Sequence, residues 1–409
     1  MYKSENCKII RDSIHGNIKI DGIFLELMAL PELQRLQWIK QLGFTHLVYP
    51  GANHTRLEHS LGTFCVAKKM AEALGLTPID TKVVSIAGLL HDIGHGPFSH
   101  TLEYLLHQRL NQDHKKLTQD MILGKIHLMD ADDEPTIKEI LECHGIDPSA
   151  IVNIIHGESE NNYLSQLING AIDADQIDYL LRDAYYTGVA YGIIDIDRLL
   201  HILTFHENRL VIKRKGVSAI ENMFVARALM YSSVYLHKTV RISELMLARA
   251  VERAPDFTFS HMIDSELIEK LKRFEGFQKE VILRLKYRKL FKKAYMKPVS
   301  KIKDYEKDRL IKVGGNVVKV EDDFAALMEI KKGYIIIDVP MRELYFSEPR
   351  LGQNTIGVLN DKRVEDLSFF TPFPQALQAR ATTDWAVMVC TTDTDAEKVS
   401  HEAEGYIFG

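Results

Sequence analysis

The segment from His91 to His100, with the sequence HDIGHGPFSH, constrains this chain more than any other stretch. It directly follows the apolar run Val83–Leu90, VVSIAGLL. A helix that is apolar on every side is buried, so this run predicts that His91 and Asp92 reach the protein interior. Buried imidazole and carboxylate groups are unfavourable unless they are paired or bind a metal ion. We therefore predict that His91 and Asp92 are metal ligands.

Two further histidines of this segment, His95 and His100, are candidates for acid and base groups beside the metal. The alternative interpretation is an ordinary helix C-terminus, in which the histidines bind free carbonyl groups and Gly94 and Gly96 end the helix. The distribution of histidine favours the first interpretation, because seven of the 17 histidines lie between positions 54 and 114. These are His54, His59, His91, His95, His100, His107 and His114.

The composition sets few limits on the fold but disfavours several classes of function. The chain has 409 residues, 46% hydrophobic and 26% charged, which is typical of a globular protein with two or three domains. A net charge of -5 gives no overall attraction to nucleic acid or anionic membranes. The four cysteines form no CxxC pair and predict neither disulfides nor a zinc knuckle. The chain shows no apolar signal core and no run of about 18 apolar residues, so we expect a cytoplasmic protein without a membrane partner.

Two other predicted helices carry residues suited to the same metal. From Leu57 to Leu74, apolar residues recur every three or four positions, which predicts an amphipathic helix with His59 near its start. The stretch from Leu164 to Tyr186 predicts a further helix, on which Asp175 lies on a polar face that turns inward. We expect these two helices to meet the segment that begins at His91.

Together these segments offer two imidazoles and two carboxylates to one cation. The expected ligands are His59, His91, Asp92 and Asp175. This mixture suits a divalent Mn, Fe, Ni, Zn or Mg ion better than an ion selected by thiolates. Four protein ligands on an ion that accepts six leave positions for water and for a phosphate oxygen, which favours a catalytic site over a structural one.

The remaining pattern predicts a mainly α-helical chain with a smaller α+β lobe at its end. A hairpin from Lys8 to Ile20, with Gly16-Asn17 in its turn, and a helix from Phe24 to Leu42 precede the histidine-rich region. Beyond it, Ser218 begins a long helix that reaches Lys238. Past Pro298 short strands alternate with helices, so we expect a catalytic domain over residues 1–300 and an accessory lobe over residues 301–409. The strands expected in that lobe are Val317–Val320, Tyr334–Val339 and Trp385–Val389, and the helices are Phe324–Glu329 and Asp395–Ala403.

Two charged stretches have ordinary explanations. Asp130–Pro135 is predicted to be an exposed acidic loop. From Arg284 to Lys297, seven of fourteen residues are Lys or Arg, which predicts a solvated helix face. A phosphate-binding or nucleic-acid-binding role is the alternative for this basic stretch.

The four expected ligands occur in the order H…HD…D, a pattern that resembles the HD-domain metal-dependent phosphohydrolases. From about Lys8 to about Lys238 the sequence is similar to the deoxynucleoside triphosphate triphosphohydrolase branch of that family. The matching segments are LQRL (33–36), IKQLG (39–43), PGA (50–52), RLEHSLG (56–62), HDIGHGPFSH (91–100) and IDADQIDY (172–179). An HD doublet alone is weak evidence, whereas its extension to HD-x-GHGPFSH with the paired segments is strong. The resemblance implies an HD-domain helical catalytic core.

The resemblance implies hydrolysis of a deoxynucleoside triphosphate (dNTP) between the 5′ oxygen and the α-phosphorus, which releases a deoxynucleoside and intact triphosphate. It implies acid–base and phosphate-contacting roles for His95, His100, Glu103 and His114. Glu103 stands where the family has an aspartate that pairs with a histidine. Because the leaving 5′ alkoxide is basic, one imidazolium should protonate it, and we favour His100 for this role.

The resemblance also implies which residues bind the substrate. Arg56 and Arg227 match phosphate-binding arginines, for which bidentate contact is the physical reason. Asp183 is expected to accept a hydrogen bond from the 3′ hydroxyl, and a phenol packed where a 2′ hydroxyl would lie excludes ribose by size. The residues that match positions around the sugar are Gln41, Leu42, Tyr179, Asp183 and Tyr235.

Three positions depart from the vertebrate members of the family. Gln176 stands in place of a lysine, which removes one positive partner of the triphosphate. Ala29 and Gln37 stand in place of an acidic residue and an arginine that bind a guanine activator. We therefore expect no GTP requirement of the vertebrate kind, although another nucleotide effector remains open. The resemblance also implies a homo-oligomer, either a dimer or a tetramer.

Two other functions fit the same sequence. One is another HD phosphohydrolase, a nucleotidase or a phosphodiesterase, acting on a mono- or cyclic phosphate. The other is a nucleic-acid-binding or nucleotide-sensing regulator in which the metal is only a structural brace. The basic stretch from Arg284 to Lys297 is the sequence support for the regulator.

Overall fold

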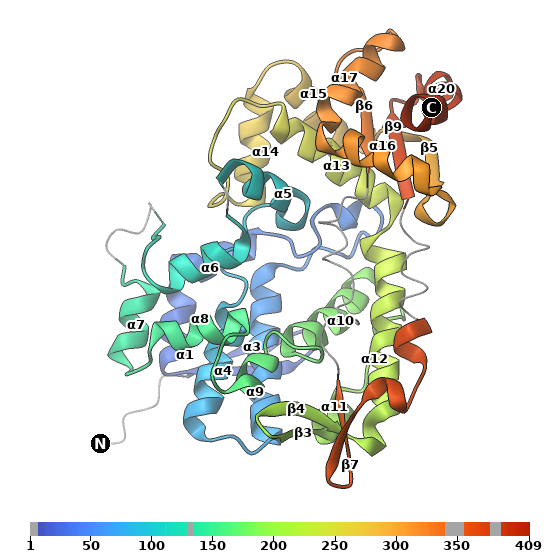
Figure 1. Ribbon diagram of the computed structural model, residues 1–409. Coiled ribbons are helices and arrows are strands. Elements are labelled where there is room, and N and C mark those ends of the chain that lie inside the picture. Colours follow the sequence, from blue (N-terminus) through green and yellow to red (C-terminus); the bar gives the residue numbers. More distant parts are fainter. Residues whose placement is uncertain (1–6, 111, 129–133, 340–355, 377–385) are drawn as a thin grey trace. The chain divides into compact units, whose positions relative to one another are not determined.

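A computed structural model describes residues 7–110, 112–128, 134–339, 356–376 and 386–409 of the chain. Within these ranges the predicted fold class is confirmed, because helices predominate and the strands form small sheets (Figure 1). None of the helices in this part of the chain is long and apolar enough to cross a membrane.

The first 230 residues are mainly helical. The helices are α1 (Ile23–Ala29), α2 (Pro31–Gln34), α3 (Arg56–Ala73), α4 (Pro78–Leu90), α5 (Ser99–Leu110), α6 (His114–Ile122), α7 (Ile137–Cys143), α8 (Pro148–His156), α9 (Asn162–Gln166), α10 (Ala174–Thr187), α11 (Ile196–Ile202) and α12 (Val217–Met230), with the 3-10 turns η1 (Arg35–Trp38), η2 (Gly43–Leu47) and η3 (Arg214–Gly216). The strands are β1 (Cys7–Asp12), β2 (Gly16–Asp21), β3 (Leu203–His206) and β4 (Arg209–Lys213).

The rest of the chain mixes helices with strands. The helical elements are the π-helical turn η4 (Tyr231–Tyr235), α13 (Lys238–Glu252), α14 (Asp264–Arg273), α15 (Phe277–Lys286), η5 (Val299–Lys301), α16 (Asp304–Gly315), α17 (Val317–Leu327), η6 (Leu367–Phe369) and α20 (Ala396–Phe408). The strands are β5 (Lys292–Pro298), β6 (Ile335–Asp338), β7 (Gly357–Asn360), β8 (Arg363–Asp366) and β9 (Ala386–Thr391).

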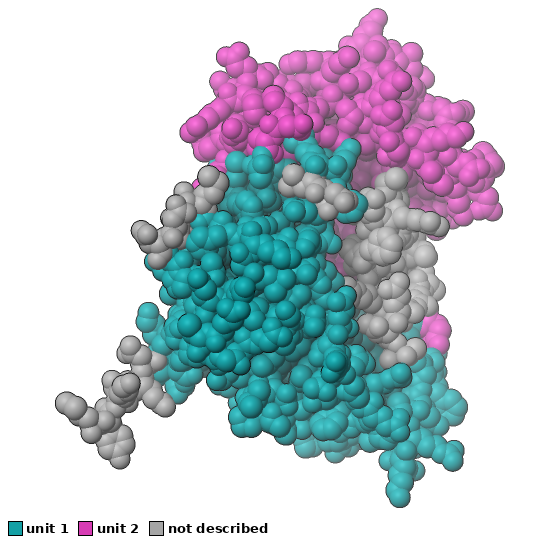
Figure 2. Space-filling model, turned by 60° about the vertical axis from the view of Figure 1, so that its left-hand side comes forward, with its two compact units in different colours: residues 1–230, 258–265, 351–374 teal, residues 231–257, 266–350, 375–409 magenta. Residues whose placement is uncertain are grey.

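The chain divides into two compact units (Figure 2). Unit 1 comprises residues 1–230, 258–265 and 351–374, and unit 2 comprises residues 231–257, 266–350 and 375–409. The two units alternate along the chain, whereas the sequence pattern suggests one boundary near residue 300. That boundary stays a prediction.

In unit 1, helix α3 packs against both α4 and α10 (Figure 1). Each of the three helices begins at a side-chain cap, because Thr55, Thr77 and Asp173 each accept a hydrogen bond from the backbone N–H three residues on. Helix α10 ends at Gly188, whose φ of 74° is the left-handed conformation that glycine adopts easily. Local sequence therefore fixes where the three central helices start and where α10 stops.

Two glycines set how closely these helices cross. At Gly88 of α4, an added Cβ would lie 3.1 Å from the Cβ of Ala67 on α3. At Gly62 of α3, an added Cβ would overlap the side chains of Asp178 and Arg182 on α10. The missing side chain at Gly62 thus leaves room for two charged groups between α3 and α10.

Unit 1 also contains a four-stranded sheet with the order β3-β4-β7-β8. Strand β4 pairs in parallel with β7, and the other neighbours are antiparallel. Segments far apart in the sequence, β4 and β7, therefore lie side by side (Figure 1).

Unit 2 is built on a three-stranded antiparallel sheet with the order β5-β9-β6. Ile337 of β6, Val389 of β9, Phe324 of α17 and Val399 of α20 belong to one buried apolar cluster. The strands predicted at Tyr334–Val339 and at Trp385–Val389 are β6 and β9, with Trp385 itself outside the described residues. The helix predicted at Asp395–Ala403 is α20.

Two predicted helices are broken. The helix expected from Phe24 to Leu42 stops after α1, because Pro31 holds Leu30 in an extended conformation with φ −66° and ψ 141°. The helix expected from Leu164 to Tyr186 is in fact two helices, α9 and α10, because the side chain of Asp173 caps a new N-terminus.

The strand predicted at Val317–Val320 is wrong, because these residues form the first turn of α17. Val317, Val320 and Phe324 lie at helical spacing and pack in the apolar cluster of unit 2. Burial of this face outweighs the preference of valine for strands. The helix predicted at Phe324–Glu329 is the second half of α17, which ends at Leu327.

Three smaller expectations also need correction. The long helix predicted from Ser218 to Lys238 ends at Met230, where the π-helical turn begins. Gly16 and Asn17 are the first residues of β2 rather than the hairpin turn. The turn lies between Asp12 and Gly16, where Oδ1 of Asp12 accepts from the backbone N–H groups of Ile14 and His15.

One of the two charged stretches differs from its prediction, and most of the other lies outside the described residues. The basic stretch Arg284–Lys297 is not one helix face, because α15 ends at Lys286 and β5 begins at Lys292. Residues 130–133 of the predicted acidic loop lie outside the described residues.

We predict that Gly62→Ala destabilises unit 1. The added methyl group must displace Asp178 and Arg182, which are fully buried ion-pair partners, so the free energy of unfolding should fall by at least about 3 kcal/mol. Gly405→Ala is the matched control, since Gly405 lies exposed in helix α20 with nothing within 4 Å of an added Cβ. That change should stabilise by roughly 0.5–1 kcal/mol. Urea unfolding of the three proteins checks both values, and equal stability of Gly62→Ala and the parent would contradict the prediction.

Candidate active site

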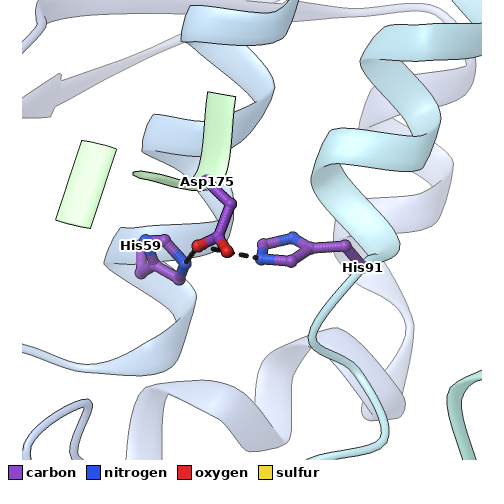
Figure 3. Close-up of side chains that lie close together, drawn as sticks. All are labelled: His59, His91 and Asp175. Atoms are coloured by element: carbon purple, nitrogen blue, oxygen red, sulfur yellow. Dashed lines mark ion pairs between the residues drawn. The ribbon is translucent and has the colours of Figure 1, made fainter. Parts of the chain in front are cut away.

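Three helices of unit 1 bring the predicted metal ligands together, and Figure 3 shows three of the four, His59, His91 and Asp175. His59 lies one turn into α3, His91 and Asp92 directly follow α4, and Asp175 is the second residue of α10. Nε2 of His59 lies 2.9 Å from Oδ1 of Asp175, and Nε2 of His91 lies 3.7 Å from the same oxygen. Oδ1 of Asp92 lies 3.2 Å from Nε2 of His91. We call these four residues the metal cluster.

Both imidazoles of the metal cluster direct Nε2 at the carboxylates. Nδ1 of His59 donates to Oδ2 of Asp178 at 2.7 Å, and Nδ1 of His91 donates to the carbonyl oxygen of Gly88 at 2.9 Å. Because Nδ1 carries the hydrogen, Nε2 of each ring is free to bind a cation. Nε2 of His91 is buried without a hydrogen-bond partner among the described residues. A buried lone pair beside two carboxylates fits a divalent ion such as Mn, Fe, Ni, Zn or Mg.

The charges of the metal cluster also favour a cation. Burial alone lowers the pKa of His59, but hydrogen bonds to Asp175 and Asp178 outweigh it and raise the pKa to about 10. Burial alone raises the pKa of Asp175, but His59 and His91 outweigh it and lower the pKa below its usual range. In the absence of metal a proton therefore stays on the imidazole, at a position where a metal ion would replace it.

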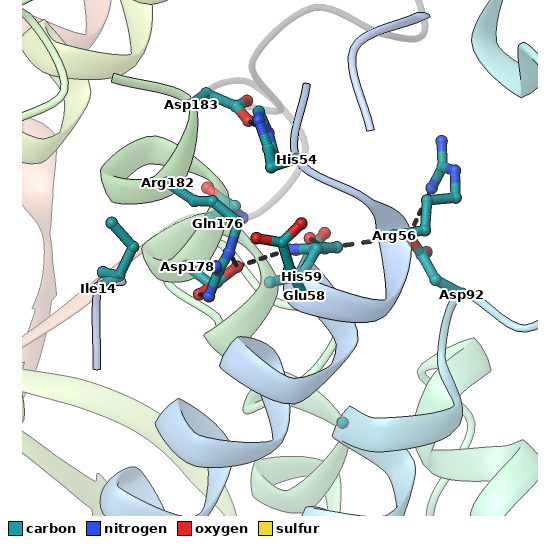
Figure 4. Close-up of polar contacts among 12 residues, drawn as sticks. Ile14, His54, Arg56, Glu58, His59, Asp92, Gln176, Asp178, Arg182 and Asp183 are labelled. Carbon is teal, nitrogen blue, oxygen red and sulfur yellow. Dashed lines mark hydrogen bonds and ion pairs between the residues drawn. The ribbon is translucent and has the colours of Figure 1, made fainter. Parts of the chain in front are cut away.

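A buried network behind His59 has no counterpart in the sequence-based expectations (Figure 4). Oδ1 of Asp178 accepts from Nε2 of His15 at 2.7 Å, and Arg182 donates to both oxygens of Asp178 at 2.9 Å. Nη1 of Arg182 also donates to Oδ2 of Asp12 at 2.8 Å. The i, i+4 spacing of Asp178 and Arg182 on α10 is the sequence signal that identifies the pair.

Asp178 is the centre of this network. It has no exposed surface, and burial alone would raise its pKa, but Arg182, His15 and His59 together lower the pKa well below its usual range. An ionised Asp178 therefore fixes both the tautomer and the orientation of the His59 ring.

A second group of side chains, which we call the Glu103 cluster, comprises Glu103, His95 and His114. Oε1 of Glu103 accepts from Nδ1 of His114 at 2.7 Å and from the backbone N–H of His114 at 3.0 Å. The rings of His95 and His114 stack, with centroids 4.1 Å apart and planes 11° apart. Nε2 of His95 lies 3.3 Å from Oδ1 of Asp92, which connects the two clusters. The extra methylene of glutamate at position 103 thus does not prevent the pairing with a histidine.

The Glu103 cluster also contains three possible metal ligands, but its geometry favours proton transfer. An imidazole binds an ion in the plane of its ring. Two rings stacked face to face, like those of His95 and His114, cannot both direct a lone pair at one ion. Burial and the positive charges of Arg56 and His114 lower the pKa of His95 well below its usual range, so His95 is a neutral group at pH 7.

His100 lies at the start of α5, with its ring centroid 5.6 Å from that of His95. The dense surrounding protein and the charge of Arg56 lower the pKa of His100 to about 4, although the residue is exposed to solvent. His100 is therefore accessible and carries no charge at neutral pH before a ligand binds.

Both arginines predicted to contact phosphate are buried and held by neighbours. Arg56 donates from Nη1 to Oδ2 of Asp92 at 2.6 Å and from Nη2 to Oγ of Ser99 at 2.7 Å (Figure 4). Nη1 of Arg227 donates to Oε1 of Gln176 at 2.5 Å. These contacts fix the two guanidinium groups before any ligand arrives.

His54, for which the sequence analysis predicted no role, contacts two of the residues predicted around the sugar, Asp183 and Gln41. Nε2 of His54 lies 2.8 Å from Oδ1 of Asp183 (Figure 4), and the backbone N–H of Gln41 donates to the carbonyl oxygen of His54 at 3.0 Å. Leu42 follows Gln41 directly. Tyr179 lies one turn before Asp183 on α10, so the two side chains leave the helix on the same side.

Tyr235 is the one predicted site residue that belongs to unit 2. It ends the π-helical turn η4, where its ring meets that of Tyr231 edge-on at 5.0 Å. Its contact with a sugar stays a prediction.

The chain was compared with known protein families. A model of the HD domain matches residues 56–183, and a model described as an HD associated region matches residues 194–408. The chain belongs to the HD-domain family. The HD-domain match covers all four residues of the metal cluster, so the protein is an HD-family phosphohydrolase with side chains that can hold a metal ion.

The chain is also similar to individual proteins. It is 35% identical to the uncharacterized protein MJ1154 of Methanocaldococcus jannaschii, over 93% of this chain and 78% of that protein. It is 30% identical to the human deoxynucleoside triphosphate triphosphohydrolase SAMHD1, over 62% of this chain but only 45% of the human enzyme. The crystal structure of a phosphohydrolase (BT4208) from Bacteroides thetaiotaomicron matches 94% of this chain and 100% of its own, with a TM-score of 0.73 and 25% identity.

We predict that Asp178→Asn weakens metal binding without removing a ligand. An amide holds the His59 ring less firmly than a carboxylate does, so the affinity for Mn²⁺ should fall by about 10-fold to 100-fold. Calorimetric titration of the metal-free protein with Mn²⁺ measures this change. Asp197→Asn, which alters an exposed carboxylate on α11, is the control and should bind like the parent. Unchanged affinity in a folded Asp178→Asn protein would rule out this role for Asp178.

Proposed function

We propose that this HD-family phosphohydrolase converts dNTPs to deoxynucleosides and triphosphate, with a divalent metal ion. The observation that carries the proposal is the position of the metal cluster directly beside the Glu103 cluster, with Oδ1 of Asp92 between them. One group of side chains is suited to a cation and the other to a proton, and phosphoester hydrolysis needs both. The 30% identity to a deoxynucleoside triphosphate triphosphohydrolase supports the choice of substrate.

In this proposal His59, His91, Asp92 and Asp175 hold the metal ion. Such an ion, when bound, polarises a phosphate oxygen and makes bound water more acidic. Arg56 binds the phosphate chain as a pre-positioned cation. Asp92 and Ser99 already hold its guanidinium, so little side-chain freedom is lost when the substrate binds.

We propose that Gln176 acts through Arg227 instead of neutralising the triphosphate. Nε2 of Gln176 donates to the carbonyl oxygen of Gly170 at 2.9 Å and to Oδ2 of Asp173 at 3.0 Å, while Oε1 accepts from Arg227. An amide anchored on two sides keeps Arg227 in one position. The neutral side chain supplies no charge of its own, so the triphosphate should bind less tightly than it would to a site with lysine at this position.

His100 is the proposed proton donor to the leaving 5′ oxygen, with the Glu103 cluster as its neighbour. The free side chain is neutral at pH 7, because its pKa is about 4. A bound triphosphate carries several negative charges, which raise the pKa of a nearby imidazole and favour its protonated form. Ionised Glu103 orients His114 in the same group, and His114 stacks on His95.

The remaining substrate contacts follow the family resemblance. In this proposal Asp183 accepts a hydrogen bond from the 3′ hydroxyl, and a phenol packed where a 2′ hydroxyl would lie excludes ribose by size. Tyr179 also matches a position around the sugar. Gln41, Leu42 and Tyr235 are the other residues that match family positions around the sugar.

We also propose that the enzyme needs no guanine activator of the vertebrate kind. Ala29 and Gln37 are exposed and offer neither a carboxylate nor a guanidinium to a guanine base. A different nucleotide effector, and assembly into a homodimer or homotetramer, remain part of the proposal through the family resemblance.

A nucleotidase or phosphodiesterase acting on a mono- or cyclic phosphate is the second candidate function. Gln176 favours it, because a neutral amide leaves fewer positive charges for a triphosphate than a lysine would.

Product analysis distinguishes these candidates. We predict that each dNTP that is consumed, in the presence of Mn²⁺ or Mg²⁺, yields a deoxynucleoside and one molecule of intact triphosphate, separable by anion exchange. Orthophosphate as the product, or hydrolysis of a cyclic nucleotide alone, would instead support the second candidate.

We predict that substitutions in the metal cluster and at His100 have different effects. The double variant His91→Ala, Asp92→Ala should lose both bound metal and turnover, because it removes two of four ligands. His100→Ala should keep metal and nucleotide binding, while kcat falls by about 10²-fold to 10⁴-fold. For the parent, kcat should decrease as pH rises through the pKa of His100 in the complex, because the donor loses its proton. His100→Ala should lack this decrease.

These effects are measured by metal analysis, nucleotide binding and the pH dependence of kcat. Turnover of dNTPs by the double variant at the parent rate would show that the metal cluster is not the catalytic centre. A pH profile of His100→Ala identical to that of the parent would exclude His100 as the donor.

A further inference from the structure

The segment from Thr258 to Ser265 belongs to the HD associated region by sequence, but it lies in unit 1 with the HD domain. It contacts the loop that follows the HD doublet. An added Cβ at Gly96 would lie 2.9 Å from the carbonyl oxygen of Ser260, so the two backbones approach closely. Nη1 of Arg35 donates to the carbonyl oxygen of Met262 at 3.3 Å.

Arg35 joins this segment to the same loop from the other side. Its Nη2 donates to the carbonyl oxygens of Ile93 and His95, at 2.9 Å and 2.8 Å. One guanidinium, only 7% exposed, thus bridges the backbone on both sides of Gly94 to the backbone of Met262. The loop that carries His95 is therefore held at its backbone by Arg35, in addition to the contacts of its own side chains.

Asp264, the last-but-one residue of the segment, makes two hydrogen bonds with separate parts of the active site. Oδ1 accepts from the backbone N–H of Phe98 at 3.1 Å, and Oδ2 accepts from the backbone N–H of Lys40 at 3.0 Å. Lys40 directly precedes Gln41, and Phe98 directly precedes Ser99. One carboxylate therefore joins two loops that reach the proposed substrate from different parts of the chain.

The bond to Phe98 restrains an unusual backbone conformation. Phe98 has a φ of 47°, in the left-handed region that residues with a side chain rarely adopt. Its ring stacks on Phe44 with centroids 4.7 Å apart, and its N–H is bound by Asp264. The two residues that follow are Ser99, which holds Nη2 of Arg56, and His100. A relaxed Phe98 would move both of them.

We propose that Asp264 is a positioning residue of the active site, supplied by the HD associated region. Its carboxylate holds the Lys40 and Phe98 backbones in the places that align Gln41, Ser99 and His100. The inference rests on the proposed function only for its kinetic measurement, since the geometry of the two loops can be tested without substrate.

The test compares Asp264→Asn and Asp264→Ala with the parent. Asparagine keeps one acceptor oxygen but places an NH₂ group against the other backbone N–H, and alanine removes both acceptors. Glu269→Gln, an exposed carboxylate on the same helix α14, is the matched control. Amide hydrogen exchange should become faster in the peptides that contain Lys40 and Phe98, and should stay unchanged in the other peptides and in the control. Should alanine prevent folding, the asparagine variant decides.

Two further measurements complete the test. Mn²⁺ affinity should stay within twofold of the parent, because both bonds of Asp264 are to backbone groups outside the metal cluster. With dNTP as substrate, kcat should fall by about 10-fold to 100-fold while KM changes less than threefold, since misalignment affects the reacting groups most.

The outcomes separate the two proposals. Unchanged exchange at Lys40 and Phe98, or faster exchange throughout the chain, overturns the role of Asp264. Faster exchange confined to the two loops with unchanged kcat also overturns it. A parent protein that releases no triphosphate from dNTPs refutes the proposed function instead, and the positioning role is then decided by hydrogen exchange and Mn²⁺ binding.

Discussion

The hydrogen bond from Nδ1 of His59 to the buried carboxylate of Asp178 is the interaction on which the rest of the site depends. A carboxylate with no exposed surface is unfavourable unless its charge is balanced. Arg182, one turn further along the same helix, supplies the opposite charge, and His15 supplies a hydrogen bond from a distant segment. The network needs the open position at Gly62, so helix packing and electrostatics impose one arrangement of α3 and α10. With that arrangement fixed, the His59 ring has one orientation, Nδ1 is held by Asp178, and Nε2 faces Asp175.

Asp92 combines the two halves of the site. Its Oδ1 lies near the imidazoles of His91 and His95, and its Oδ2 accepts from Arg56. A single carboxylate therefore lies at the boundary between a group of ligands suited to a cation and a group suited to proton transfer. Because Arg56 and His95 are buried and His114 is held by Glu103, their dipoles and charges are oriented before a substrate arrives, which is how a preorganised site stabilises developing charge.

The sequence named the residues of the two clusters but not the residues that hold them in place. His91, Asp92 and the Glu103 cluster could be found because they occur in a distinctive local pattern, or at positions that match a known family. Asp178, His54 and Asp264 could not be found in the same way, because each acts on a residue that is far away in the chain. The i, i+4 spacing of Asp178 and Arg182 indicates that the two pair, but not that the pair supports His59. The errors in the fold have a similar origin. Val317 and Val320 favour a strand locally, but their burial against Phe324 requires a helix.

The sequence by itself determined the starts of α3 and α4, the end of α10 at Gly188, and the types of side chain offered to a cation. Capping and chain stiffness act within a few residues, so they can be read from local sequence. Only the tertiary structure decided that His59, Asp92 and Asp175 meet, that Asp178 lies behind them, and that a segment beyond residue 257 holds the loop at Phe98. These contacts join residues distant in sequence, and the balance between burial and ion pairing that selects them exists only once the helices have packed.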